Sequence, residues 1–303
     1  AIYFSSWAVG PLGMILALAG AGIGNAIRCK LGKHHFTLFM CIALSVSSAC
    51  LVYAGFLKLA ELLFHISVQH EAGYICSMLF IIPGFPFITS GIDLAKLDMR
   101  SGLERLAYAI IVVMVAAVSA WLMALLLHLK PVDFLPLGFG STEDPVPASG
   151  KLLWVFGFSV MFNSPVPLAA AAAFIGALSN TLRLELVDLA GFPPAAAAFF
   201  GALTAGLLAS LIKTKVGYPR ISITVPSIVI MVPGLYLYRA IYNLGIMSLN
   251  VSASWFAAAI LIIVALPLGL IFARIYGQNV PLLHLMGIQK GLLSVASGHQ
   301  LSF

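Results

Sequence analysis

The sequence predicts an all-α membrane protein that crosses the bilayer about nine or ten times, and composition is the first observation behind this. Of its 303 residues, 61% are hydrophobic and 9% are charged, and the mean hydropathy is +1.07. Soluble domains are usually about half apolar and about a quarter charged. The chain has too few charges to cover a surface of its size in water, so apolar side chains must face lipid.

The second observation is a series of apolar runs, most of them close to the roughly 20 residues that cross a bilayer core. None of the runs alternates between apolar and polar residues, so helices are favoured over a β-barrel. The run at 151–164 is short, and Asn163, Pro165 and Pro167 predict a kinked or broken helix there. The runs lie at residues 7–27, 36–60, 73–95, 105–129, 151–164, 166–183, 194–214, 221–243 and 252–274.

The third observation is an internal repeat. Residues 77–84 match 227–234 at an offset of 150, and 25–28 and 4–11 match 180–183 and 158–165 in the same order. Five spans per half would orient the halves oppositely, as in secondary transporters with inverted repeats. We expect a first transmembrane repeat at 1–130, a polar connection at 131–150, a second repeat at 151–275 and a tail at 276–303. The alignment also predicts that the first repeat lacks most of its opening helix, as in an N-terminally shortened form of a longer protein.

Basic residues predict the orientation of the chain in a cell inner (plasma) membrane. Eleven of the sixteen Lys and Arg residues fall in loops that would share the cytoplasmic side, which places the loops at 61–72, 130–150 and 243–252 outside. Those eleven are Arg28, Lys30, Lys33, Lys96, Arg100, Arg105, Lys213, Lys215, Arg220, Arg274 and Lys290.

Several functional classes lack support in the sequence. The pI near 9.2 comes from dispersed basic residues and not from a basic face, so no nucleic-acid partner is expected. The cysteines have no CxxC spacing and no HExxH occurs, so no metal is expected. Walker A and GxSxG sequences are absent too, which argues against an ATP-driven pump and a serine hydrolase. We expect no cofactor and no catalytic residues.

The most informative segment begins at Pro83 and Gly84, which should break the third apolar run. Downstream, Thr89, Ser90 and Asp93 have the helical spacing that puts them on one face. An acid within a membrane is by default a functional candidate, so Asp93 is expected to bind substrate or couple protons. The alternative is a structural Asp93 near the cytoplasmic end, paired with Lys96 or Arg100.

The second half carries a matching break at Pro233 and Gly234. At the offset of 150, Asp93 corresponds to Asn243 and Thr89 to Arg239. An inverted repeat would bring the two breaks together, so that Asp93 and Arg239 could face one cavity. Arg239 suits a carboxylate, which it can bind bidentately. The alternative is an Arg239 that extends to the outer membrane interface.

From Pro83 to Arg105 the sequence resembles the threonine/serine exporter family. The pattern here is Pro83-Gly84, Asp93, Asp98, Ser101-Gly102 and Arg105, and the second half is similar through Phe158, Asn163, Pro165, Thr224, Pro226, Pro233-Gly234 and Tyr238. The resemblance covers nearly the whole chain and adds Asp98 and Arg105 to the candidate site. It implies export of threonine, serine or related small solutes, coupled to the membrane potential or the proton gradient. Arg239 lies outside the resemblance and rests on its charge alone.

The combined interpretation is a secondary transporter that exports small amino acids by proton antiport, with protons, the solute and lipid as its partners. A homo-oligomer is left open. One alternative is a transporter or channel for another small carboxylate, such as a dicarboxylic acid. Another is an intramembrane enzyme that uses Asp93 and Asp98 as paired acids, but residues five apart on a helix point in different directions.

Overall fold

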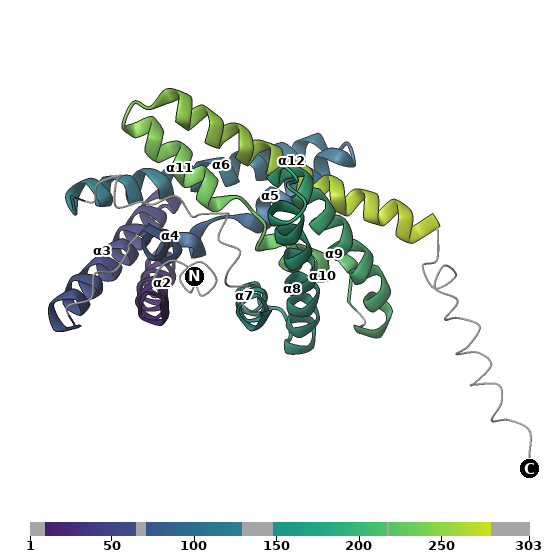
Figure 1. The fold of residues 1–303 in the computed structure, drawn as a ribbon, viewed down its shortest axis with the longest axis horizontal. Coiled ribbons are helices and arrows are strands. Elements are labelled where there is room, and N and C mark those ends of the chain that lie inside the picture. Colours follow the sequence, from purple (N-terminus) through teal and green to yellow (C-terminus); the bar gives the residue numbers. More distant parts are fainter. Residues whose placement is uncertain (1–9, 65–70, 129–147, 217, 280–303) are drawn as a thin grey trace, which may run out of the picture.

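The structure is a computed structural model that describes residues 10–64, 71–128, 148–216 and 218–279 (Figure 1). Within these ranges all regular secondary structure is helical, which confirms the predicted fold class. The first-half elements are α2 (Gly10–Lys33), α3 (Leu38–Phe64), α4 (Glu71–Met78), the 3-10 turn η1 (Leu79–Ile81), α5 (Gly84–Ala95) and α6 (Met99–Leu126). The others are α7 (Ala148–Met161), α8 (Val166–Asp188), α9 (Pro194–Val216), α10 (Arg220–Val229), α11 (Gly234–Gly245) and α12 (Leu249–Asn279).

Five helices in the described part of the chain are long and apolar enough to cross a membrane: α3, α6, α8, α9 and α12. Two bent pairs bring the number to seven if each pair is one span. The pair ending in α5 bends by 55° and the pair ending in α11 by 47°. The remaining apolar runs form α2 and α7. The 14 residues of α7 would be about 21 Å long, shorter than a hydrocarbon core of roughly 30 Å. The chain is therefore a polytopic membrane protein, with five to seven candidate spans among the residues that the structure describes.

The long helices divide their surface between lipid and protein. On α6, Ile110, Leu122 and Leu125 are exposed, whereas Ala109, Ala116 and Ala120 are buried. Small buried side chains allow membrane helices to approach closely, and large apolar ones on the opposite face suit lipid. The same division holds for α12, where Ile260, Leu261 and Val264 are exposed and Ala259 and Ala273 are buried.

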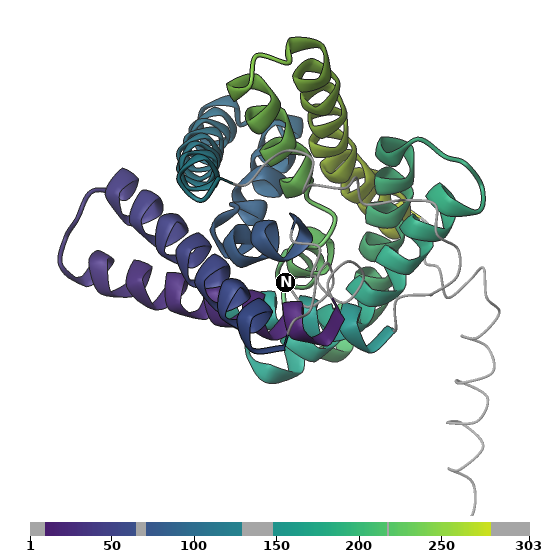
Figure 2. The same cartoon turned by 60° about the vertical axis from the view of Figure 1, so that its left-hand side comes forward.

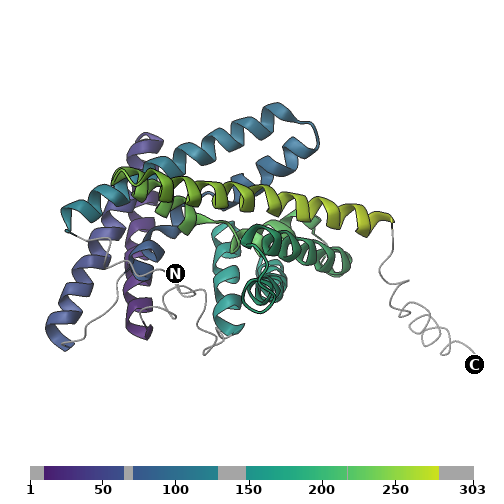
Figure 3. The same cartoon turned by 45° about the horizontal axis from the view of Figure 1, so that its top comes forward.

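The two halves pair their helices in the same order. In the first half, α2 packs on α3, α3 on α6 and α5 on α6, and in the second α8 packs on α9, α9 on α12 and α11 on α12. Figure 2 shows the α2–α3 hairpin side by side. The short helices cross between the halves, because α5 also packs on α12 and α11 also packs on α6. Figure 3 shows α12 extending across helices of both halves.

Backbone geometry repeats closely at the offset of 150 over residues 82–102 and 232–252. Leu97 and Met247 both take left-handed φ values, of 64° and 60°, in the turn after the short helix. The same backbone hydrogen bonds form in both copies, among them Gly84 N to Ile82 O (2.8 Å) and Gly234 N to Val232 O (2.9 Å), and Asp98 N to Asp93 O (3.0 Å) and Ser248 N to Asn243 O (2.8 Å).

The buried core is shared between the halves. One apolar cluster is built from α2, α3, α4 and α6 and also contains α11 side chains, among them Leu235, Tyr238 and Ile241. The other is built from second-half helices and contains Ile88 of α5. Each short helix after a break is thus buried partly in the opposite half, which places both breaks in the centre of the protein.

Candidate functional site

The two predicted helix breaks are present and have the same local shape. Pro83 has φ −81° and ψ 64°, and Pro233 has φ −81° and ψ 53°, both outside the helical region. Proline has no N–H to donate, and the following glycine begins a new helix in a different direction. A break in a membrane helix is tolerated where protein covers it or where it lines a cavity.

The breaks pack against each other reciprocally. A Cβ added to Gly84 would lie 3.3 Å from a methyl group of Val229 and of Val232, the residues that precede the second break. A Cβ added to Gly234 would meet Ile82 and Leu79, the residues that precede the first. These contacts are equivalent at the offset of 150, since Leu79 corresponds to Val229 and Ile82 to Val232. The structure therefore brings Pro83-Gly84 and Pro233-Gly234 together.

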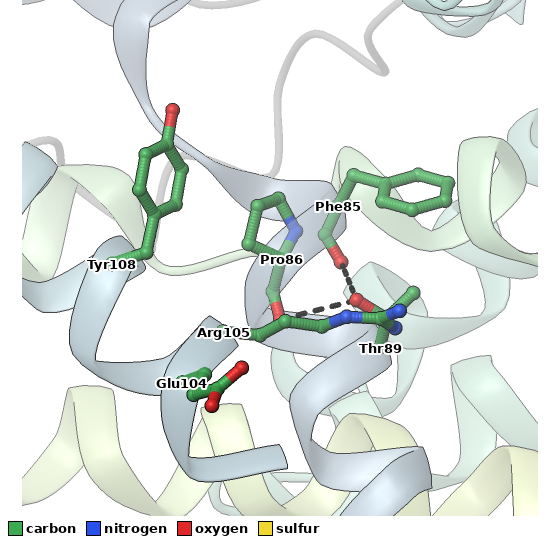
Figure 4. A pocket seen from close by; sticks show the side chains of 6 residues that line it. All are labelled: Phe85, Pro86, Thr89, Glu104, Arg105 and Tyr108. Atoms are coloured by element: carbon green, nitrogen blue, oxygen red, sulfur yellow. Dashed lines mark hydrogen bonds between the residues drawn. The ribbon is translucent and has the colours of Figure 1, made fainter. Parts of the chain in front are cut away.

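A pocket of about 370 Å³ opens beside the first break, between α5 and α6 (Figure 4). Such a volume is within the range of small-molecule sites. Of the predicted site residues, it includes Thr89 and Arg105. The lining residues are Phe85, Pro86 and Thr89 from α5, and Glu104, Arg105 and Tyr108 from α6.

Arg105 joins this pocket to Asp93. Its Nη1 donates to Oδ2 of Asp93 at 2.7 Å, and the Asp93 side chain is 17% exposed whereas that of Arg105 is 50% exposed. The sequence offers Lys96 and Arg100 as partners of Asp93, but α6 folds back along α5 and brings Arg105 to it instead. Arg100 pairs with Glu104 at 3.1 Å on the exposed surface. The acid is thus largely covered, while its cation reaches the pocket.

The residues around Asp98 form the turn between α5 and α6, which brings Arg105 to Asp93. Asp98 caps α6 and accepts a hydrogen bond from the Ser101 N–H at 3.4 Å. A Cβ added to Gly102 would lie 2.7 Å from Leu94 Cγ and 3.1 Å from the Leu94 backbone nitrogen, so glycine lets α6 approach α5 closely. Asp98 therefore acts as the N-cap of α6, at the exposed end of that helix.

Two hydroxyl groups on α5 bond to their own helix. Thr89 Oγ1 lies 3.0 Å from the Phe85 carbonyl and 3.3 Å from that of Pro86, and it lines the pocket (Figure 4). Ser90 donates to the Phe87 carbonyl at 2.8 Å and is buried. Thr89 is also buried, with 3% exposed, but of the two it is the residue that lines the pocket, where its hydroxyl could exchange a backbone acceptor for a ligand.

In the second half, Arg239 is buried between α11 and α12. Its side chain is 7% exposed, and its Cζ lies 5.0 Å from the ring centre of Trp255. Trp255 also meets Tyr236 edge to face, with ring centres 5.3 Å apart. Asn243 donates to the Arg239 carbonyl at 2.7 Å. The contact of Arg239 with Trp255 thus lies within the α11–α12 hairpin, and the ion pair of Asp93 with Arg105 lies within the α5–α6 hairpin.

Comparison with known families decides the identity of the chain. Residues 2–128 match a family model described as "Putative threonine/serine exporter", and residues 150–276 match one described as "Threonine/Serine exporter, ThrE". The two matches lie in tandem and cover most of the chain. The chain belongs to the threonine/serine exporter family. No curated protein and no solved structure matches it.

In this member of the threonine/serine exporter family, the pocket and its surroundings combine groups that suit an α-amino acid. A guanidinium can bind a carboxylate through two parallel hydrogen bonds, and a carboxylate can bind an ammonium group. Arg105 supplies the first, and Asp93 and Glu104 are the acids beside it. Phe85, Pro86 and Tyr108 give the rest of the wall a largely apolar character.

Sequence reasoning missed three residues near Arg105 and Arg239: Glu104, Tyr108 and Trp255. Glu104 and Arg105 precede Tyr108 on α6 by four and three residues, a helical spacing that could have indicated their common face. Trp255 stands at the offset of 150 from Arg105, so extending the repeat would have found it. Over the described ranges, no group of three or more His, Cys, Asp or Glu residues is placed to hold a metal ion.

Proposed function

We propose that the protein exports small amino acids of the threonine/serine type from the α5–α6 pocket by proton antiport. Membership of the exporter family supports amino-acid export as the class of activity. The observation that carries the finer proposal is the ion pair of Asp93 with Arg105, one member largely covered and the other lining the pocket.

An ion pair of this kind is complementary to a zwitterion. The head group of an α-amino acid has one carboxylate and one ammonium, so it can replace each partner of the pair. Arg105 would then hold the solute carboxylate, and Asp93 would hold the ammonium. The Thr89 hydroxyl lines the same pocket and is the candidate partner for the hydroxyl of serine or threonine.

Proton coupling follows from competition for Asp93. A protonated Asp93 is neutral and no longer attracts an ammonium group, so the carboxyl binds either a proton or the solute. Protons that enter from outside would load Asp93 and then leave it to the cytoplasm, where an amino acid replaces them. A dicarboxylic acid has no ammonium group and would meet Asp93 and Glu104 as like charges, so this chemistry favours amino acids.

Alternating access is often built on two halves of opposite orientation in the membrane. We propose this inverted arrangement, in the plasma membrane, because the hairpins α5–α6 and α11–α12 share backbone geometry and each short helix packs into the other half. The pocket lies beside the basic segment at residues 96–105, and its Lys and Arg residues support a cytoplasmic location for that segment. An exporter loads from that side. The proposed repeats at 1–130 and 151–275 also rest on this shared backbone geometry and packing.

The test is counterflow into proteoliposomes that hold the purified full chain. Labelled serine and threonine should accumulate against the same unlabelled solute, and succinate should not. An imposed pH gradient should drive net serine movement opposite to the protons. Succinate accumulation with no serine accumulation would overturn the proposal, and so would serine flux that ignores the pH gradient.

A further inference from the structure

We infer that the space between α11 and α12 is a second half-site for the same solute carboxylate, closed in this structure by Trp255 and Tyr236 over Arg239. The inference deepens the proposed function and rests on it. It identifies Arg239 as the residue that receives the carboxylate on the release side, and the two aromatic residues as the gate that covers it.

The position of this half-site follows from the repeat. Each residue that lines the α5–α6 pocket has a counterpart at the offset of 150 on α11 or α12. The offset is meaningful here because both hairpins form the same backbone hydrogen bonds along their turns. The counterparts are Leu235, Tyr236, Arg239, Ser254, Trp255 and Ala258.

Aromatic side chains occupy two of the counterpart positions in the second hairpin. Trp255 stands in place of Arg105 and Tyr236 in place of Pro86, and their rings meet edge to face at 5.3 Å. Leu235 is 7% exposed, whereas its counterpart Phe85 is 37% exposed. The two hairpins thus share one backbone geometry, and the second is more covered at Leu235 and Trp255, as expected if one half-site opens while the other closes.

A positive charge lies in both spaces although it comes from different helices. Arg105 belongs to the long helix α6 and lines the pocket against α5. Arg239 belongs to the short helix α11 and contacts Trp255 on the long helix α12. The Arg239 guanidinium therefore lies between the two helices of its hairpin, as Arg105 does in the first. A guanidinium held between the helices in this way suits a carboxylate.

The second half-site differs from the first in lacking the acid. Asn243 occupies the position of Asp93, and its amide is engaged with the Arg239 carbonyl at 2.7 Å. An amide cannot take up a proton in this way, so proton exchange belongs to the first hairpin alone. The Arg239 half-site should bind the carboxylate without releasing or taking up a proton.

The first experiment measures whether the closed space opens. Leu235→Cys is made in the full chain with its four native cysteines replaced by serine, and labelling by an impermeant thiol reagent is followed in proteoliposomes. Labelling should become at least tenfold faster when serine and a pH gradient drive export. Met247→Cys, at a position that is 80% exposed in the α11–α12 turn, should be labelled at a constant rate. An unlabelled Leu235→Cys during active serine export would overturn the inference and leave the proposed function standing.

The second experiment assigns Arg239 to one side of the membrane. In serine exchange, Arg239→Gln should raise the KM measured from the release side at least tenfold and leave the KM on the loading side within twofold. Arg239→Lys should fall between Arg239→Gln and wild type, and the exposed Lys58→Gln serves as the charge control. Equal KM changes on both sides, or none, would remove Arg239 from a release-side site. If wild-type protein moves no serine at all, the proposed function itself fails.

Discussion

At the scale of single residues, the proposal gives Arg105 the main part in what the α5–α6 pocket binds. It is half exposed, lines the pocket and bonds to Asp93 at 2.7 Å, so it links the solute space to a covered acid. Arg100, one turn away on the same helix, has a 90% exposed side chain and pairs only with Glu104 among the ion pairs found in the described part of the chain. Exposed pairs of that kind contribute little, typically under about 1 kcal/mol.

These two arginines give a matched test. Arg105→Gln should reduce serine export at least tenfold, because the solute carboxylate loses a charged, bidentate partner worth roughly 1.5–3 kcal/mol. Arg105→Lys should recover part of the activity, since the charge remains and the fork geometry does not. Initial rates in proteoliposomes measure both. Arg100→Gln should stay within twofold of wild type, and an equal loss in both Gln variants would argue against a specific role for Arg105.

At the scale of helices, the close approach of α5 and α6 holds Asp93 and Arg105 together. Gly102 lies against Leu94 with no room for a Cβ, and Asp98 caps the same end of α6. Much of the segment that resembles the exporter family therefore forms the turn between α5 and α6. This turn brings Arg105 to Asp93. A Cβ added to Gly55, in α3, would meet nothing within 4 Å, so this glycine serves as a reference.

Substitution by alanine should destabilise the protein at Gly102 but not at Gly55. Gly102→Ala should lower the melting temperature and weaken export, because overpacking at such a contact costs about 1–3 kcal/mol. Gly55→Ala should leave stability unchanged or raise it by roughly 0.5–1 kcal/mol, as expected for alanine in a helix. Thermal unfolding in detergent compares them. A Gly102→Ala protein as stable and active as Gly55→Ala would show that the α5–α6 approach is not tight.

The sequence could predict the elements better than their contacts. Pro83-Gly84 and Pro233-Gly234 act through the local backbone, so both breaks were readable, and so was the all-helical membrane fold. Helix α6 begins at Met99 and not near residue 105 because Asp98 caps it, a local signal that the apolar pattern hides. The pairing of Asp93 with Arg105 depends on how α6 folds back, and the stacking of Arg239 on Trp255 depends on α12. Such contacts arise from tertiary packing, which spacing alone does not specify.

At the scale of the whole molecule, the halves share their cores and meet at their helix breaks. Gly84 contacts the residues before the second break and Gly234 those before the first, so a movement of one short helix is transmitted to the other half. The packing of α5 on α12 and of α11 on α6 has the same consequence. Alternating access would then be a coupled change of two hairpins around one central contact.

The proposed orientation of the halves is open to a labelling test. Cysteines placed in 28–35 and 213–220 should be protected from an impermeant thiol reagent in intact cells, and those placed in 61–72 should react, since the basic loops are expected in the cytoplasm. Labelling after permeabilisation is the control for reactivity. The reverse pattern would place the α5–α6 pocket on the outer side and contradict its role as the loading site.

The central claim, that Asp93 exchanges a proton for the solute ammonium, is tested most directly by the pH dependence of serine export in proteoliposomes that contain Asp93→Asn. Asparagine cannot ionise and resembles the protonated acid. The account predicts that net export driven by a pH gradient is abolished, while serine-for-serine exchange survives at reduced affinity, and that Asp98→Asn has a milder effect because Asp98 caps α6. Full gradient-driven export by Asp93→Asn would contradict the account and leave the Asp93–Arg105 pair as a structural contact.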